Sequence, residues 1–348
     1  MNERSGREPF LSGAQIGSVA SGNEPSLGGE HGIRQVREHL LSTLAKPSTT
    51  HLRRAAIGDW LAATGDPRPG VGLGEDGLPD LVWCPVSGSE VLLRDTAGPV
   101  QVERFYLAKY PVTWAQYRLF LEAKDGHANL IWWDGLRRRL EYERTDLPVD
   151  NQPAQEVSWF DAVAYCRWLS SKLDYDVRIP TEWEWQLAAT GGDGELLYPW
   201  GHDTGAIYAN TRESHLHRAT AVGMYPAGES PVGALDMAGT ILEWCINEFA
   251  NPDHVKLTGN APRVLRGGSW FLIFNFARNI FRTGYDPYFR FNSVGFRLAA
   301  SSLAPRPRPV IPDPQFDAEP EPNPESHSDG PSPDVIAPTN EDNGALEN

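Results

Sequence analysis

The chain has few cysteines and no long hydrophobic run. Its 348 residues include only three cysteines, Cys84, Cys166 and Cys245, which stand far apart. Isolated cysteines form neither a disulfide framework nor a CxxC metal motif. No apolar run approaches the ~18 residues that a membrane helix needs, and the polar residues 1–30 lack the apolar core of a secretory signal. These absences predict a reduced, cytoplasmic protein without a membrane span.

Basic residues are also scarce. The chain has 31 Lys and Arg against 46 Asp and Glu, a formal net charge of −15. A nucleic-acid-binding protein presents a basic face, so this balance predicts no nucleic-acid partner. Residues 305–348 hold ten acidic residues, two arginines and eleven of the 29 prolines. Such a segment buries too little apolar surface to order itself, and we predict a disordered acidic tail over residues 301–348.

The sequence pattern of the rest of the chain changes twice. Residues 1–30 are predicted to be disordered, and apolar spacing over residues 31–65 predicts a helical hairpin. The Pro/Gly-rich residues 66–80 read as a linker. From residue 81 to 300 the pattern becomes short strands and turns, with strands expected at 82–83, 90–93 and 102–107.

Three helices interrupt these strands. Their predicted N-caps are Thr113, Ser158 and Thr181, the last two with an acidic residue three positions later. Strands and helices mixed in this way predict an α+β domain.

Short motifs follow one another in order between Leu81 and Ala300. They are residues 105–113 (FYLAKYPVT), 153–159 (PAQEVSW), 178–185 (RIPTEWEW), 198–201 (YPWG), 210–211 (NT), 236–239 (DMAG), 243–244 (EW), 263–270 (RVLRGGSW) and 295–297 (GFR). This set resembles the formylglycine-generating enzyme (sulfatase-modifying factor) family. The resemblance implies a C-type-lectin-like α+β fold, with few regular elements and long ordered loops around a small twisted sheet.

The resemblance also identifies the catalytic positions. Enzymes of this family oxidise a substrate cysteine with copper held by two cysteines, the third and eighth residues after the serine of the Gly-Gly-Ser motif. Here those residues are Leu272 and Ala277, which offer no thiolate to bind Cu(I) or substrate. Cys245 is the nearest alternative and is predicted to be a buried structural cysteine. We therefore expect no formylglycine formation, and predict that the chain is not an enzyme.

A second branch of the family, the iron-dependent sulfoxide synthases, joins this domain to a helical module with an HxxxHxE iron triad. The N-terminal His31, His39 and His51 lack that spacing, and His215-Leu216-His217 reads as an exposed loop. No cofactor is predicted. The resemblance allows a structural calcium ion at Asn210, although Thr240 stands where a second calcium loop of the enzymes has Asn.

Residues 271–293 (FLIFNFARNIFRTGYDPYFRFNS) have an unusual composition. Six Phe and two Tyr mix with small polar residues in no helical or strand period. We predict that five residues of the segment are fixed framework positions: Ala277, Arg278, Arg282, Pro287 and Arg290. The three arginines are expected to form salt bridges that hold the loop. The other eighteen positions lack Lys, Glu, Gln, Met and Trp, the types that no pyrimidine-ending codon encodes.

Randomising the adenines of AAC or AAT codons would produce this restriction. The segment resembles the variable region of diversity-generating retroelement target proteins, many of which have this same fold with a Gly-Phe-Arg strand directly after the variable segment. Aromatic side chains beside small polar ones are typical of recognition surfaces. We predict a diversified, non-catalytic surface that binds a protein or peptide ligand. Its residues are Phe271, Leu272, Ile273, Phe274, Asn275, Phe276, Asn279, Ile280, Phe281, Thr283, Gly284, Tyr285, Asp286, Tyr288, Phe289, Phe291, Asn292 and Ser293.

Three alternatives stay open at this point. Residues 271–274 could form a buried core strand. The chain could be an ordinary family member with a degenerate active site, acting as a sensor or effector-associated module beside the helical hairpin. It could also be an oxidoreductase that uses an unrecognised site.

Overall fold

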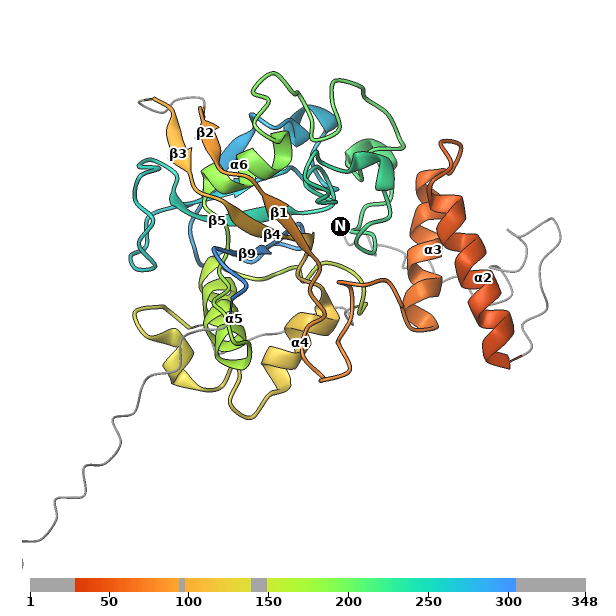
Figure 1. The fold of residues 1–348 in the computed structure, drawn as a ribbon, viewed down its shortest axis with the longest axis horizontal. Helices are drawn as coiled ribbons and strands as arrows, with labels where there is room; N and C mark the ends of the chain where they lie inside the picture. Colours follow the sequence, from red (N-terminus) through yellow and green to blue (C-terminus); the bar gives the residue numbers. More distant parts are fainter. Residues whose placement is uncertain (1–28, 94–97, 139–148, 305–348) are drawn as a thin grey trace, which may run out of the picture. The chain divides into compact units, whose positions relative to one another are not determined.

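The computed structural model describes residues 29–93, 98–138 and 149–304 (Figure 1). These described residues all fall within one compact unit. Disorder was predicted for residues 1–30 and 301–348, and most of both segments lies outside the described residues. The prediction is wrong for Gly29 and Glu30, which belong to the first helix. None of the described helices is both long and apolar enough to cross a membrane.

The two predicted N-terminal helices are present as α2 (Gly29–Leu44) and α3 (His51–Ala63). The Thr50 hydroxyl caps α3 by accepting a hydrogen bond from the Arg53 amide. The two helices bury Leu40, Leu44, Ile57 and Leu61 together with Ala221, Met224 and Tyr225. Burial of this apolar face against the following domain stabilises a helix pair that would be marginal alone. The division into separate domains stays a prediction.

Nine strands form three sheets (Figure 1), among the residues that the structure describes. The three-stranded sheet has the order β1 (Trp83–Val86), β4 (Phe105–Pro111), β9 (Arg297–Ala300), and the two-stranded sheet pairs β2 (Ser89–Val91) with β3 (Val100–Val102). The four-stranded sheet has the order β7 (Arg282–Tyr285), β6 (Arg263–Arg266), β5 (Leu242–Glu248), β8 (Val294–Gly295).

Strand pairing differs from the simplest expectation. The predicted strands at 82–83 and 90–93 do not pair with each other around Ser87-Gly88, because β1 pairs with β4 and β2 pairs with β3, both antiparallel. The predicted strand at 102–107 is divided between β3 and β4. Central β4 is buried along most of its length, so its neighbours β1 and β9 are selected by burial rather than by nearness in sequence.

All three predicted helices begin at the predicted caps. They are α4 (Trp114–Glu122), α5 (Trp159–Lys172) and α6 (Glu182–Thr190), with capping boxes at Thr113, Ser158 and Thr181. Within the described ranges there are also four short 3₁₀ helices: η1 (Leu130–Trp133), η2 (Arg212–Ser214), η3 (Pro226–Gly228) and η4 (Phe274–Ala277).

The main core lies where α4 and α5 meet the strands, and includes Trp159, Tyr165, Trp168, Trp244 and Phe296. Helix α6 packs against β2, β3, β5 and β6 (Figure 1). The predicted α+β class is confirmed, with long loops between short elements.

Candidate functional site

The eighteen predicted surface positions of residues 271–293 differ sharply in exposure. Nine side chains are exposed, eight are half-buried and one is buried. Phe271 is 62% exposed, and residues 271–274 form no strand. The alternative of a buried core strand is therefore wrong. The exposed set is Phe271, Asn275, Phe276, Ile280, Tyr285, Asp286, Phe289, Phe291 and Asn292.

Three exposed rings gather into an aromatic patch, which consists of Tyr285, Phe289 and Phe291. The Tyr285 ring centroid lies 5.8 Å from that of Phe289 and 5.4 Å from that of Phe291, and the two Phe centroids are 5.2 Å apart. Phe271 is a further exposed ring. It contacts Trp270 edge-on, and the Trp270 indole donates to the Asn292 carbonyl at 3.1 Å. Exposed rings this close offer a binding partner a ready apolar contact.

Other side chains of the segment face inward in part. Phe276 contacts Phe281 with ring centroids 5.0 Å apart, whereas Leu272, Phe281 and Tyr288 lean against the main core. Phe274 packs edge-on against Tyr198 at 4.9 Å. Of these residues Phe276 is exposed, and the half-buried ones anchor the surface to the core.

The backbone of the segment is fixed by bonds to residues outside it. Four of its carbonyls accept from backbone amides elsewhere in the chain. The carbonyl of Leu272 accepts from Arg212 at 2.9 Å, and that of Pro287 from Trp159 at 3.1 Å. The carbonyl of Phe291 accepts from Glu156 at 3.0 Å, and that of Ser293 from Leu242 at 2.9 Å. The Asn279 amide donates to the Leu197 carbonyl at 2.8 Å. Such bonds hold the loop in one conformation independently of its exposed side chains.

Two of the three predicted framework arginines form the expected salt bridges. Arg282 donates to both carboxylate oxygens of Glu182 at 2.8 and 2.9 Å, and Arg290 pairs in the same bidentate way with buried Asp161. Arg278 makes no such pair with any residue that the structure describes, so the prediction is not confirmed there. Bidentate pairs of this kind fix a loop's position as well as its charge balance.

Asp161 sits at the centre of the arrangement that holds the C-terminal half of the segment. Burial acts to raise the pKa of its carboxyl, but the His127 ring 3.8 Å away, hydrogen bonds from Arg290 and Ser158, and the Arg290 charge outweigh burial and lower that pKa. The carboxylate therefore stays ionised and keeps its partners at neutral pH.

Two predicted surface positions belong to the framework instead. Asn279 is fully buried. Its side-chain Nδ2 donates to the Leu196 carbonyl at 3.0 Å, and its backbone carbonyl accepts from the Arg266 guanidinium. Gly284 lies against Phe249, and a Cβ added there would come within 2.3 Å of the Phe249 ring. The sequence pattern could not separate these two from their exposed neighbours, since both contacts join residues distant in the chain.

The residues at the family's catalytic cysteine positions cannot hold copper. Leu272 is half-buried against the core, and Ala277 is buried beside Tyr198 and Ala238. Cys245 is fully buried, as predicted, and burial raises the pKa of its thiol. Within the described ranges, no group of three or more His, Cys, Asp or Glu side chains is placed to hold a metal ion. The donor atoms present here do not fit a copper centre.

Asn210, the predicted calcium ligand, is buried with both ends of its amide engaged. Its oxygen accepts from the Ser214 hydroxyl at 2.8 Å and its nitrogen donates to the Arg218 carbonyl at 3.0 Å. Calcium binding stays a prediction. His215 and His217 are exposed, as predicted.

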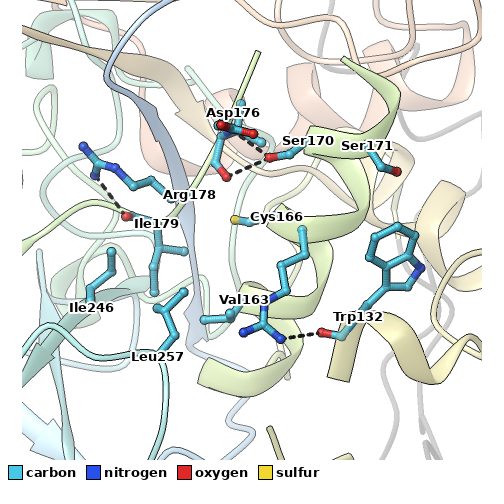
Figure 2. Close-up of a pocket in the computed structure, with 12 residues that line it drawn as sticks. Trp132, Val163, Cys166, Ser170, Ser171, Asp176, Arg178, Ile179, Ile246 and Leu257 are labelled. Atoms are coloured by element: carbon cyan, nitrogen blue, oxygen red, sulfur yellow. Dashed lines mark hydrogen bonds between the residues drawn. The ribbon is translucent and has the colours of Figure 1, made fainter. Parts of the chain in front are cut away.

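A pocket of about 380 Å³ lies away from the segment, between α5, residues 176–179, Ile246 and Leu257 (Figure 2). Cys166 lies at its centre, and burial raises the pKa of that thiol. Arg167 spans one side by donating to the Trp132 carbonyl at 3.0 Å. Sequence reasoning missed this pocket because its lining runs from residue 132 to residue 257, and only the α5 positions show a regular spacing.

Comparison with known proteins shows which family and which proteins the chain is similar to. The family model described as "Sulfatase-modifying factor enzyme 1-like domain" matches residues 85–302. Hercynine oxygenase of Mycobacterium tuberculosis is 33% identical over 237 residues, which cover 58% of this chain and 53% of that protein. Formylglycine-generating enzyme of Streptomyces coelicolor is 34% identical over 221 residues, covering 53% of this chain and 67% of that enzyme.

Among solved structures, Treponema denticola variable protein 1 superposes with a TM-score of 0.50 at 21% identity, over 64% of this chain and 95% of that one. At this identity the likeness shows the shared fold alone. The chain spans about half the length of the hercynine oxygenases that it matches.

These relatives correct one prediction. The expectation that the chain is not an enzyme is wrong, because similar proteins are named as an oxygenase and as a formylglycine-generating enzyme. That expectation was drawn from missing motifs, above all from Leu272 and Ala277 at the two cysteine positions. A missing thiolate pair removes one kind of copper chemistry and does not decide what other side chains of the domain do.

Proposed function

Because the chain belongs to the sulfatase-modifying factor enzyme 1-like domain family, we propose that residues 271–293 form a diversified ligand-binding surface carried on that family's fold. One observation carries the proposal. The segment's backbone is tied to the framework by hydrogen bonds and by the Arg282 and Arg290 ion pairs, while most of its predicted variable side chains are exposed or half-buried.

This division of roles suits recognition. When framework residues fix the backbone, exposed side chains can change without altering the fold, and little conformational entropy is lost on binding. The aromatic patch supplies large rings with few rotatable bonds, the usual anchors of protein interfaces. Asn275, Asp286 and Asn292 add exposed polar groups among them. We infer a protein or peptide ligand that offers apolar groups to the patch.

The absence of five residue types from the eighteen positions supports diversification by a retroelement. The solved neighbour named a variable protein is consistent with this proposal, although it bears on the fold only. Under this proposal, the codons of Asn279 and Gly284 should not vary freely. Asn279 is enclosed by framework contacts and Gly284 has no room for a side chain beside Phe249.

The test is to sequence this gene in closely related isolates together with its flanking DNA. We expect changes concentrated in the codons of the exposed positions, each matching an adenine in a nearby template copy, with Asn279 and Gly284 unchanged. Changes spread evenly over residues 81–300, with no template copy, would contradict diversification.

A second candidate function is an oxidation of the kind that the relatives' names describe. The 33% identity to hercynine oxygenase over 237 residues favours it. The test is to incubate the purified chain with hercynine, a thiol and air, and to follow hercynine by mass spectrometry. Its consumption would support an oxygenase, and unchanged hercynine beside an active relative would count against one.

A further inference from the structure

A second cavity opens beside residues 271–293 and has a volume of about 450 Å³. Phe274 and Asn275 of the segment form one wall, His51 of α3 forms another, and Tyr198, Thr211 and Glu213 complete the lining that matters here. The cavity therefore joins two predicted surface positions to framework residues from three other parts of the chain.

Glu213 is held at this cavity by hydrogen bonds. The Phe274 amide donates to both of its carboxylate oxygens at 3.0 and 3.1 Å, and the Thr211 hydroxyl donates to Oε2 at 2.7 Å. Partial burial acts to raise the pKa of this carboxyl, but these bonds together lower it. Arg212 adds to the lowering by its charge and is not part of the lining.

His51 does not balance that negative charge. Its Nδ1 lies 2.8 Å from the Tyr225 hydroxyl, and burial, then Arg54, then His215 lower the pKa of its ring. The imidazole is therefore neutral at pH 7. Among the described lining residues, Glu213 carries the formal charge, and Tyr198 and Phe274 add apolar surface to the lining.

We propose that this cavity binds a primary ammonium group on an apolar stem, as on a lysine side chain of the ligand. A carboxylate offers about four lone-pair directions, and the hydrogen bonds that Glu213 accepts from the Phe274 amide and the Thr211 hydroxyl use three of them. One remaining direction suits a single N–H of an ammonium group better than the paired N–H groups of a guanidinium. The apolar stem would lie along Phe274 and Tyr198. The inference rests on the proposed function, because the ligand is the one that residues 271–293 bind.

The test uses Nα-acetyl-lysine N-methylamide as the probe, titrated into the full chain and followed by NMR of the Phe274 and Tyr198 ring protons. The norleucine counterpart keeps the stem without the charge, and the arginine counterpart carries a guanidinium. We expect the lysine probe to bind at least fivefold more tightly than either. Equal binding of the norleucine probe would overturn the proposal, and tighter binding of the arginine probe would overturn its choice of ammonium.

Glu213→Gln is the matched variant, because the amide oxygen can still accept from the Phe274 amide while the charge is lost. We expect it to weaken the lysine probe at least fivefold. The control is Glu75→Gln, which makes the same change at an exposed carboxylate outside both residues 271–293 and the cavity lining and should leave binding unchanged. Equal binding by wild type and Glu213→Gln would overturn the site. Failure of the proposed function is seen separately, in the isolate sequences, because probe binding does not depend on codon variation.

Discussion

The guanidinium of Arg290 donates two hydrogen bonds to the carboxylate of Asp161, at 2.8 and 2.7 Å, across 129 positions of sequence. Asp161 is at the same time the third residue of α5, where its carboxylate accepts from the Ser158 amide and hydroxyl. One buried carboxylate thus fixes both the start of a core helix and the C-terminal half of the proposed binding segment.

Arg290→Met should destabilise the protein strongly. The Arg290 side chain is 9% exposed and Asp161 is fully buried, so the variant leaves a buried carboxylate without its charged partner, which costs about 3–5 kcal/mol. Urea unfolding followed by Trp fluorescence measures the change in unfolding free energy. The control is Arg218→Met, whose pair with Asp59 is 41% and 45% exposed and should contribute no more than about 1 kcal/mol. Similar losses in both variants would show that the Arg290 pair does not hold the segment.

Exposed rings of the aromatic patch should be replaceable at little cost to folding. Phe289→Ser removes a ring that is 47% exposed, and we expect a change in unfolding free energy within about 1 kcal/mol. Phe296→Ala, just beyond the segment, removes a fully buried ring and should cost about 3–5 kcal/mol. Thermal and urea unfolding of the two variants compare them directly. If Phe289→Ser were as damaging as Phe296→Ala, the segment could not tolerate the variation that the proposal requires.

Thr240 is expected to store backbone strain. This β-branched residue has φ of 58° and is buried, and its hydroxyl has no hydrogen-bond partner among the residues of the described structure. A left-handed conformation costs a non-glycine residue about 1–3 kcal/mol, more than the roughly 1 kcal/mol of chain entropy that glycine adds to the unfolded state. We therefore expect Thr240→Gly to raise the melting temperature.

Thr220→Gly is the matched control for that variant. Thr220 is also buried with an unpartnered hydroxyl within the described chain, but it is not among the residues with positive φ. The control should lower the melting temperature. A fall in both variants would mean that the conformation at Thr240 is not strained.

Local features of the fold could be predicted from the sequence, and distant contacts could not. The caps at Thr113, Ser158 and Thr181 act on the next three residues, so their pattern is visible in the sequence. The pairing of β4 with β9 joins Leu107 to Ala299, and no local signal specifies such a partner. For the same reason the composition of residues 271–293 indicated a surface, while the burial of Asn279 by Leu196 and Arg266 became visible only in three dimensions.

Asp236 should make stability depend on pH in the direction opposite to Asp161. Its carboxyl is buried, and although the Gly223 amide donates to it at 2.5 Å, burial dominates and raises its pKa to about 6. Between about pH 4, where the unfolded residue titrates, and pH 6, the folded protein keeps a proton that the unfolded chain has lost. This group's contribution to stability therefore falls as pH rises through that range, by about 3 kcal/mol.

Asp236→Asn removes that titration while keeping an oxygen that can accept from the Gly223 amide, and Asn tolerates the φ of 58° found here. We expect wild type to lose stability relative to the variant between pH 4 and pH 7, measured as the difference between their unfolding free energies in urea at each pH. Taking that difference cancels the pH-dependent contributions of the carboxyls that both proteins share. One of these is Asp161, whose lowered pKa removes stability only as the pH falls below about 4. A difference that stays constant from pH 4 to pH 7 would mean that Asp236 is ionised throughout, with solvent or a cation reaching a carboxylate that is enclosed in this structure.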